Sequence, residues 1–594
     1  MLIDDLNEAQ REAATHIDGP CVVVAGAGSG KTAMLVTRVH ELIRSGVPPN
    51  RILCCTFTKK ATKEMQERIV RDIGPRGKSV IVSTIHALAM RMVLPRMEDW
   101  KLVAKTEWMF EVVLGPKSRV NRYGTGLLKD LSVEDAMMAV SKSKNSKEKP
   151  HQVKDPMIRA VYQSYEALKY ARKMLDFDDL LVKANEFLKD EAFAKQIQSR
   201  FTHISVDEFQ DVNLIQWDLI RKLAEPHHNL LVVGDDMQSI YGFRGARPEL
   251  ILQFARYYPA AKTILLERNY RSREPVIIAS NRVIAINQRQ LHKRVVAHRK
   301  GGEPVRTLHV KDEYDQVKRI VQTMNSLKTA FSELKWSDFA VLYRTNQESI
   351  PFEEIFADQH IPYELTDGTH FFENYKVKPI IAYMNVMDAL NRDELPEMDD
   401  LVTTLKNPKG ALRREAIERV QANGMEVVGN HPDYKPYTDA LAKLMDKQHP
   451  AQFINTLGQV YPDLTNTKEE ETWFDALLRI CAKFTTTRAF LVHVDYTLQQ
   501  AKQPKDDAVR CMSIHQSKGL EFGTVFVANL VNGFIPYRRA VDEGNVEEET
   551  RLFYVAMTRA MDRLYLCVPK TIGNKACAPS PFLDELKELR GAVK

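Results

Sequence analysis

The chain has 594 residues, and its 84 basic and 78 acidic side chains give a net charge of +6 at pH 7. With 44% hydrophobic and 27% charged residues, it has the composition of a globular protein with room for several domains. The small basic excess permits a polyanionic partner without requiring one, so we expect any surface for nucleic acid to be local.

The seven cysteines contain no C-x-x-C pair, which argues against disulfides, a zinc ribbon and a cysteine-ligated cluster. The N-terminus, Met1–Asp5, does not have the basic and then apolar pattern of a signal sequence. No apolar run approaches the roughly 18 residues of a membrane span. We therefore expect a cytoplasmic protein without a membrane-spanning segment.

The first predicted helix opens at Leu6–Gln10, just before a buried strand, Cys21–Val24. A carboxamide can donate and accept along one base edge, so Gln10 is a candidate reader of adenine. The alternative for Gln10 is a solvated residue at a helix start.

A glycine-rich turn, Ala25–Thr32, joins this strand to an amphipathic helix, Ala33–Ile43. Backbone N–H groups and a helix N-terminus then form a cradle for a nucleotide polyphosphate. We expect Lys31 to reach the β- and γ-phosphates and Thr32 to ligate Mg2+. The strict pattern has Gly in place of Ala25, and an ordinary turn is the alternative. The predicted cradle comprises Ala25, Gly26, Ala27, Gly28, Ser29, Gly30, Lys31 and Thr32.

Two further strands, Ile52–Phe57 and Val80–Val82, end in hydroxyl, lysine and aromatic side chains. Open α/β sheets bind ligands at these strand ends, although Phe57 could instead belong to the core. Residues 87–200 then interrupt the sheet pattern with a mostly helical insertion. Within it we expect Ser141–Lys154 to be a solvated loop, and a candidate for phosphate contact.

The sheet pattern resumes at His203–Val206, followed directly by Asp207 and Glu208. We expect Asp207 to hold the Mg2+ shell and Glu208 to orient or deprotonate the attacking water. Another buried strand, Leu230–Asp235, leads into a loop that carries Gln238, Tyr241, Phe243 and Arg244. One loop could thus sense the γ-phosphate through its amide and stack bases on its aromatic rings.

By this point the chain resembles superfamily 1A DNA helicases of the UvrD/Rep/PcrA family, and the family's later motifs follow in order. They are Glu267–Ser272 (motif IV), Asp338–Asn346 (IVa), Ser513–Phe522 (V) and Glu549–Ala560 (VI). The resemblance covers nearly the full length. It implies an α/β fold of two RecA-like P-loop motor domains, with parallel sheets flanked by helices. A mostly helical domain is inserted into each motor domain.

The implied domains are 1A (1–86 and 202–265), 1B (87–201), 2A (266–371 and 506–594) and 2B (372–505). ATP would lie between the two motors. The resemblance implies that Tyr270 stacks on adenine, that Gln10 reads its edge and that Glu521 binds the ribose. Arg271 and Arg559 would reach the γ-phosphate from the second motor, and guanidinium groups there neutralise charge in the transition state.

For DNA, the resemblance implies that the stacking groups are Phe57, Tyr241 and Phe243. Backbone contacts or couplers would be Thr84, His86, Arg244, Arg344, Asn346 and His515. Binding should be indifferent to base sequence and weakened by salt. The family moves 3′ to 5′, and no residue by itself gives the polarity.

Two stretches depart from the family. The duplex-gripping turn of 2B corresponds to Asn407–Arg414, which keeps one glycine and adds basic residues. The hairpin after motif VI, Pro569–Lys575, contains no aromatic residue, although Ile572 could act as an apolar wedge. The chain ends at Lys594, soon after the motor motifs, so we expect neither a nuclease domain nor a long partner-binding tail.

The sequence thus predicts an ATP- and Mg2+-dependent 3′-5′ helicase and translocase on single-stranded DNA and on junctions between single-stranded and duplex DNA. Repair, replication or recombination, protein partners and self-association fit this role, as does a nucleoid-associated protein of a bacterium or phage. One alternative is a translocase that strips proteins from DNA and unwinds poorly without a partner. Another is a nucleotide-binding scaffold or switch without motor output. An RNA substrate also stays open.

Overall fold

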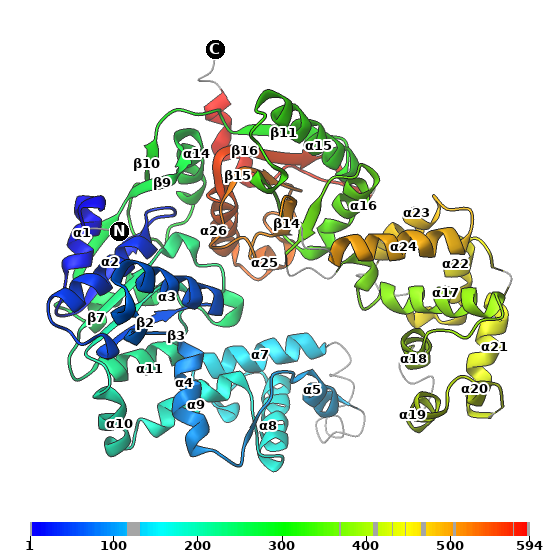
Figure 1. Ribbon diagram of the computed structural model, residues 1–594, viewed down its shortest axis with the longest axis horizontal. Coiled ribbons are helices and arrows are strands. Elements are labelled where there is room, and N and C mark those ends of the chain that lie inside the picture. The colour runs from blue at the N-terminus through cyan, green and yellow to red at the C-terminus, as the bar shows by residue number, and fades with distance from the viewer. Residues whose placement is uncertain are drawn as a thin grey trace. The chain divides into compact units, whose positions relative to one another are not determined.

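The computed structural model describes residues 3–115, 131–366, 370–407, 414–430, 432–445, 447–464, 471–502, 506–573 and 575–590 (Figure 1). Contacts divide the chain into two compact units. Unit 1 comprises Met1–Glu303, Ala540–Thr558 and Glu585–Lys594, and unit 2 comprises Pro304–Arg539 and Arg559–Asp584. Among the described helices, none has the length and apolar character needed to span a bilayer.

Unit 1 is built on a parallel sheet with the strand order β3-β2-β6-β7-β1-β8. The strands are β1 (Cys21–Ala25), β2 (Ile52–Thr56), β3 (Ile81–Thr84), β6 (His203–Val206), β7 (Leu230–Gly234) and β8 (Lys262–Leu266). Strands β1, β2, β6 and β7 are buried along their whole length. This is the pattern of a parallel sheet covered by helices on both faces.

Alternate residues of β1 belong to two different cores. Val22 and Val24 pack with one group of helices, whereas Cys21 and Val23 pack with the other. The first group comprises α4 (Ile85–Val93), α9 (Phe177–Phe187), α10 (Glu191–Gln198) and α11 (Leu214–Ala224). The second comprises α1 (Glu8–Thr15), α2 (Lys31–Arg44) and α3 (Lys59–Ile73), drawn in dark blue in Figure 1.

Among its described residues, the insertion in unit 1 is helical apart from the short strands β4 (Lys101–Leu102) and β5 (Met174–Leu175). Its core lies among α5 (Glu107–Leu114), α7 (Val133–Asn145) and α8 (Pro156–Ala171). The predicted loop at Ser141–Lys154 is wrong in its first part, because α7 continues through Asn145. Ser143, Lys144 and Asn145 are buried there.

Beyond the sheet, unit 1 continues with α12 (Glu249–Leu252), α13 (Phe254–Tyr257), β9 (Arg268–Arg273), α14 (Glu274–Ile284) and β10 (Val296–Arg299). Strands β9 and β10 pair in parallel. Helix α26 (Val546–Met557) packs against α14 and against the single turn Asp236–Gln238. It is preceded by α25 (Arg538–Asp542). Motif IV and most of motif VI therefore lie in one compact unit with the glycine-rich turn Ala25–Thr32.

Unit 2 has its own parallel sheet, with the order β11-β16-β15-β12-β14-β13. The strands are β11 (Arg306–Val310), β12 (Phe339–Tyr343), β13 (Tyr363–Leu365), β14 (Val509–Ser513), β15 (Phe522–Val527) and β16 (Ala560–Pro569). Helices α15 (Glu313–Ala330) and α16 (Ile350–Asp358) pack on it. After the sheet, β17 (Thr571–Ile572) and β18 (Lys575–Ala576) form a short antiparallel hairpin.

Among the described residues, the insertion in unit 2 is helical. It contains α17 (Val377–Asn391), α18 (Met398–Lys406), α19 (Arg414–Asn423), α20 (Glu426–Asn430), α21 (Lys435–Leu444), α22 (Pro450–Val460), α23 (Glu471–Cys481) and α24 (Thr487–Lys502). Buried side chains from α17 to α24 form one core. Most of the predicted turn at Asn407–Arg414 lies outside the described residues.

These sheets confirm the predicted α/β class. Most predicted strands agree with the structure to within a residue at each end, whereas the predicted Val80–Val82 is β3, Ile81–Thr84. All seven cysteines are free thiols, and six of them are buried. The division into four domains stays a prediction.

Candidate nucleotide and nucleic-acid site

The predicted phosphate cradle follows β1 and ends at the first turn of α2. Gly28 and Gly30 both have positive φ, at 63° and 78°. A Cβ on Gly30 would lie 2.6 Å from Gln10 Nε2, and one on Gly28 would lie 2.7 Å from Arg271 Cβ. Glycine is thus required at both positions for conformation and for space. The turn presents the N-terminus of α2, which is a favourable place for phosphate oxygens.

Gln10 and Tyr270 both hydrogen-bond to this turn, and Asn7 connects them to each other. The Gln10 amide donates to Ser29 O at 2.8 Å, and Tyr270 N donates to Gly28 O at 2.9 Å. Asn7 caps α1 in a reciprocal pair with Gln10, and its Nδ2 donates to the Tyr270 hydroxyl at 2.8 Å. The sequence analysis did not identify Asn7, although Asn followed three residues later by Gln is a helix-capping pattern.

Lys31 and Glu208 face each other across the ends of β1 and β6. Lys31 Nζ lies 3.5 Å from Glu208 Oε2, and their side chains are 13% and 27% exposed. Glu208 has a φ of 52°, and its carboxylate also accepts from Gln210 Nε2 at 2.5 Å. This leaves Glu208 as a half-buried carboxylate beside the cradle, as a water-activating base requires.

The residues around the cradle fit a nucleotide with Mg2+. Thr32 lies in the first turn of α2 and Asp207 directly follows β6, so both offer the oxygen ligands that Mg2+ prefers. The buried hydroxyl of Ser29, inside the turn, has no hydrogen-bond partner among the described residues. Phosphate oxygens would provide one.

Gln238 lies in a single helical turn, Asp236–Gln238, just after β7. Its Nε2 donates to Asp235 Oδ2 at 2.6 Å. Asp235 also pairs with Lys293, which the sequence analysis did not identify. Lys293 is far away in the sequence and belongs to no recognisable motif, so no sequence signal points to it.

The predicted stacking residues of unit 1 lie together. The rings of Phe57 and Tyr241 are stacked with centroids 5.3 Å apart, and Phe243 lies 6.0 Å from Tyr241. The Arg244 guanidinium lies 5.3 Å from the Tyr241 centroid and 5.4 Å from that of Phe243. Phe57 is therefore not a core residue but part of a partly exposed aromatic group at the sheet edge.

Helix α26 holds the loop that carries these rings. Gly242 N donates to Glu548 Oε1 at 3.0 Å, and Arg551 Nε donates to Ser239 O at 2.7 Å. A Cβ on Gly242 would collide with the Glu548 carboxylate. Neither Glu548 nor Arg551 was identified from the sequence as a support for this loop.

Thr84 and His86 lie at the start of α4. The Thr84 hydroxyl accepts from Ala87 N at 3.2 Å, so it caps the helix. Burial lowers the pKa of His86, although Asp178 nearby opposes this, so the imidazole is neutral at pH 7. Both side chains can therefore act toward DNA as hydrogen-bonding groups and not as charges.

The two predicted arginines belong to different units. Arg271 lies in unit 1, where one of its terminal nitrogens donates to Thr558 O at 3.2 Å. Arg559 lies in unit 2, is 1% exposed and donates to Leu520 O at 3.1 Å.

The other predicted residues of unit 2 lie at the ends of its strands. Arg344 follows β12, and its guanidinium lies 4.9 Å from the Tyr537 ring centroid. Asn346 and Glu521 are exposed, and His515 is half-buried just after β14. In the hairpin β17–β18, Ile572 is half-buried.

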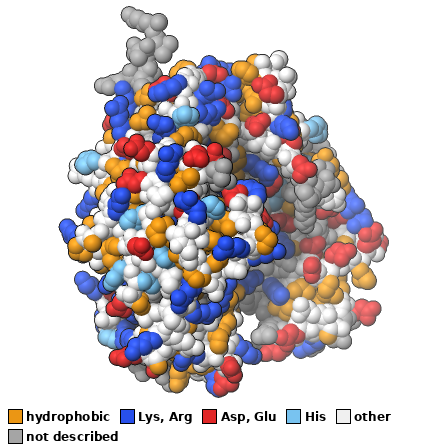
Figure 2. Space-filling model, turned by 60° about the vertical axis from the view of Figure 1, so that its left-hand side comes forward, with side chains coloured by type: hydrophobic (Ala, Val, Ile, Leu, Met, Phe, Trp, Pro, Cys, Tyr) orange, Lys and Arg blue, Asp and Glu red, His pale blue; other side chains and the backbone are white. Residues whose placement is uncertain are grey.

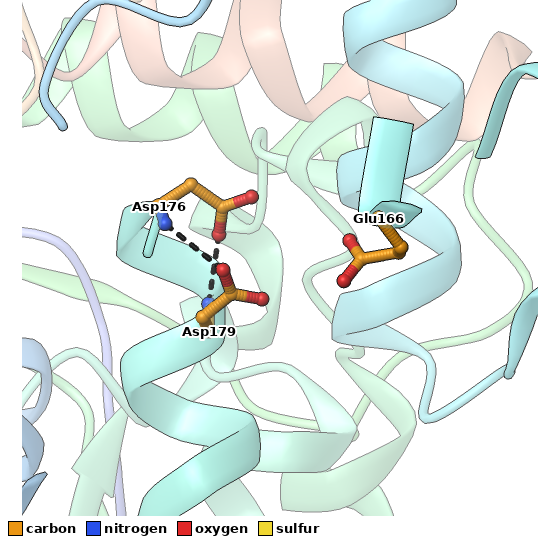
Figure 3. A group of neighbouring side chains, drawn as sticks. All are labelled: Glu166, Asp176 and Asp179. Atoms are coloured by element: carbon orange, nitrogen blue, oxygen red, sulfur yellow. Dashed lines mark hydrogen bonds between the residues drawn. The ribbon is translucent and has the colours of Figure 1, made fainter. Parts of the chain in front are cut away.

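A second group of carboxylates lies in the insertion of unit 1. Glu166, Asp176 and Asp179 point toward one another (Figure 3), with oxygens close enough to surround a cation. Two lysines already occupy this space. Lys144 Nζ lies 2.7 Å from Asp176 and Asp179, and Lys169 Nζ lies 2.8 Å and 2.5 Å from the same two residues. The group is a buried ion-pair network, and it includes Lys144 from the part of the predicted loop that is helical.

Basic and acidic side chains are interspersed on the face drawn in Figure 2. Hydrophobic side chains are scattered among them. This distribution agrees with a small net charge and with local contacts to a polyanion.

Known families match most of the chain. Residues 6–259 match the UvrD/REP helicase N-terminal domain, and residues 264–431 and 388–571 match the UvrD-like helicase C-terminal domain. YjcD of Bacillus subtilis (strain 168) is 33% identical, over 98% of this chain and 81% of YjcD. The ATP-dependent DNA helicase UvrD1 of Mycobacterium tuberculosis (strain ATCC 25618 / H37Rv) is 32% identical, over 99% of this chain and 86% of UvrD1. The ATP-dependent DNA helicase Rep of Escherichia coli (strain K12) is 28% identical, over 98% of this chain and 94% of Rep.

Proposed function

Since the chain belongs to the UvrD/Rep/PcrA family of ATP-dependent DNA helicases, we propose that it moves along single-stranded DNA in the 3′ to 5′ direction and unwinds duplex DNA. The observation that carries the proposal is the loop after β7. It carries Gln238 directly after Met237, which packs with Ala27 of the phosphate cradle, and its Tyr241 is stacked on Phe57 at 5.3 Å. A change at the nucleotide can thus reach the DNA-stacking rings through a few bonded residues.

In this proposal the nucleotide is ATP with Mg2+. Lys31 and the N-terminus of α2 bind the phosphates, and Thr32 and Asp207 hold the metal. Glu208 orients and deprotonates the attacking water, and Gln238 senses the γ-phosphate and helps to orient that water. Tyr270 stacks on the adenine, Gln10 reads its edge and Glu521 binds the ribose. Arg271 and Arg559 neutralise the charge that develops on the γ-phosphate.

For DNA, we propose that bases stack on Phe57, Tyr241 and Phe243. Stacking on an aromatic ring contributes roughly 1–3 kcal/mol per base and tolerates any base. The contacts to the DNA backbone come from Thr84, His86, Arg244, Arg344, Asn346 and His515. The division into domains 1A, 1B, 2A and 2B, a cytoplasmic location near the nucleoid, and work in repair or replication belong to the same proposal.

The test measures ATP hydrolysis with and without single-stranded DNA, together with strand displacement on duplexes that carry a 3′ or a 5′ tail. The proposal expects strong stimulation by DNA, and displacement from the 3′ tail only. Displacement from the 5′ tail would contradict the polarity. An ATPase that DNA does not stimulate would overturn the motor function and leave the nucleotide-binding switch. The same assay with single-stranded RNA decides the sugar preference.

One observation favours a translocase that unwinds poorly without a partner. The hairpin β17–β18, which follows motif VI, is formed by Thr571–Ile572 and Lys575–Ala576 and presents no aromatic ring in its strands. An apolar wedge as small as Ile572 stacks less well on a base pair than a flat ring does. DNA-stimulated hydrolysis without displacement would support this second function.

A further inference from the structure

Lys293 is a buried cation in the segment between α14 and β10 of unit 1. Its side chain is 0% exposed. Its Nζ lies 2.7 Å from Asp235 Oδ1 and 2.5 Å from Asp236 Oδ1, and both aspartates are buried as well. None of the roles proposed above uses this lysine, yet it contacts the acidic pair that begins the loop between the cradle and the stacking rings.

The two aspartates have different second partners. Asp235 Oδ2 accepts from Gln238 Nε2 at 2.6 Å, so Asp235 joins Lys293 to Gln238. Asp236 Oδ2 instead accepts from Leu291 N at 2.9 Å. This hydrogen bond holds the segment that carries Lys293 against the turn Asp236–Gln238. One lysine therefore serves two carboxylates, and only one of these touches the residue that is proposed to orient the attacking water.

We propose that Lys293 is a positioning residue that acts through Asp235 to fix which end of the Gln238 carboxamide faces the nucleotide. This inference rests on the proposed function of Gln238. An ionised carboxylate only accepts hydrogen bonds, so Asp235 can hold the NH2 end of the amide and not its oxygen. The oxygen end is then turned away from Asp235, and an oxygen is what an amide needs in order to accept from water.

The ammonium group holds the Asp235 carboxylate in place, because it contacts Oδ1 at 2.7 Å while Oδ2 accepts from Gln238. Burial alone would lower the pKa of Lys293, but Asp235 and Asp236 raise it above its ordinary 10.5, so the lysine stays charged at pH 7. Without the ammonium group the Asp235 carboxylate loses the partner that fixes its orientation, and the Gln238 amide that it holds is no longer fixed.

The alternative is that Lys293 only neutralises buried charge. A pair of isosteric variants separates the two roles, because Asp235→Asn and Asp236→Asn each remove one carboxylate and leave one aspartate paired with Lys293. If Lys293 acts through Asp235, Asp235→Asn lowers the kcat of ATP hydrolysis at least tenfold with an unchanged KM for ATP. Asp236→Asn then stays within twofold of the wild type. Equal kcat values in the two variants would overturn the inference.

A second comparison uses Lys293→Met and Gln238→Ala. Residues that act through one another give non-additive effects. We expect the double variant to have the same kcat as Gln238→Ala alone. A fold-loss of kcat in the double variant equal to the product of the two single fold-losses would overturn the inference, since a lysine with only a structural role acts independently of Gln238. Because Lys293→Met leaves two buried carboxylates unpaired and can impair folding, the aspartate variants keep the inference testable.

All kcat values are measured with and without single-stranded DNA. A wild type that DNA does not stimulate overturns the proposed motor function. In that case the ratio of the kcat values of Asp235→Asn and Asp236→Asn, measured without DNA, still tests the positioning role of Lys293. The failure of one proposal is thus distinguishable from the failure of the other.

Discussion

Two of the groups in unit 1 in which lysine faces carboxylates differ in how deeply their side chains are buried and in how close the charges lie. At the cradle, Lys31 meets Glu208 at 3.5 Å, and both side chains are partly exposed. In the insertion, Lys144 and Lys169 are each 2% exposed and contact three carboxylates at 2.5–2.9 Å. The first group is thus partly open to solvent, whereas the lysines of the second are enclosed within the fold.

The difference follows from the surroundings and not from the residue types. The buried network is enclosed by α7, α8 and α9, and the Tyr165 hydroxyl donates to Asp176 at 2.9 Å. The cradle lies at the open end of a parallel sheet, where α/β proteins bind ligands. A lysine beside an acid therefore indicates catalysis only when the pair is loose and accessible. The predictions below test this distinction.

The largest expected effect is on ATP hydrolysis, through the partly exposed pair of Lys31 and Glu208. Glu208→Gln keeps the shape of the side chain and removes the proposed base, so we expect kcat for ATP hydrolysis to fall about 10²–10⁴-fold. ATP and DNA binding and the melting temperature should stay near those of the wild type. Steady-state hydrolysis, nucleotide binding and thermal unfolding measure the three quantities. Substantial turnover by this variant would sink the assignment of the base.

Changes in the buried network around Lys144 and Lys169 should instead affect the stability of the fold. Lys144→Met leaves buried carboxylates with too little positive charge, and we expect it to lower the free energy of unfolding by about 3–5 kcal/mol. The matched control is Lys142→Met, an exposed position on the same helix, which should change stability by less than about 0.5 kcal/mol. Urea unfolding measures the stability of both variants, and hydrogen exchange of the α8 amides measures it locally. Equal losses in the two variants would mean that the network does not stabilise the insertion.

These two lysines also show how far the sequence could be interpreted. Lys142 and Lys144 lie in one lysine- and serine-rich stretch, and nothing in its composition distinguishes the exposed residue from the buried one. The burial of Lys144 depends on Asp176 and Asp179, more than 30 residues away. Local composition predicted a solvated loop at this point, whereas Lys144 lies at the end of α7 and is paired with two distant aspartates.

The sheet and the cradle were predictable because their signals are local. A short apolar run followed by glycines and Lys-Thr describes β1, the turn and α2 within some twenty residues. The two parallel sheets and the stacking of Phe57 on Tyr241 follow from the family's motifs, which recur at known strand ends. Asn7, Glu548 and Lys293 were missed because each acts through a residue far away in the sequence, at separations of 263, 306 and 57 residues.

Acid should weaken the buried network in a definite pH window. Burial alone would raise the pKa of Asp176, but Lys144 and Lys169 lower it below its ordinary 3.8. A carboxyl group with a lowered pKa stabilises the folded state above its unfolded pKa, and this contribution is lost as the pH falls through the folded pKa. We expect the free energy of unfolding to fall below about pH 3.8, and more steeply in the wild type than in Lys144→Met. Parallel pH profiles for the two proteins would contradict this account.

The smallest effect is expected for Glu166, the most exposed member of the network. Its side chain is 35% exposed, and its Oε1 lies 2.8 Å from Lys144 and 2.9 Å from Lys169. Glu166→Gln leaves two lysines with two aspartates, so the buried charge balances, and the amide oxygen can still accept a hydrogen bond. We expect a loss of about 1 kcal/mol or less in urea unfolding, because partly exposed ion pairs contribute little. A loss as large as that of Lys144→Met would show that the geometry of the network, and not its charge balance, stabilises the insertion.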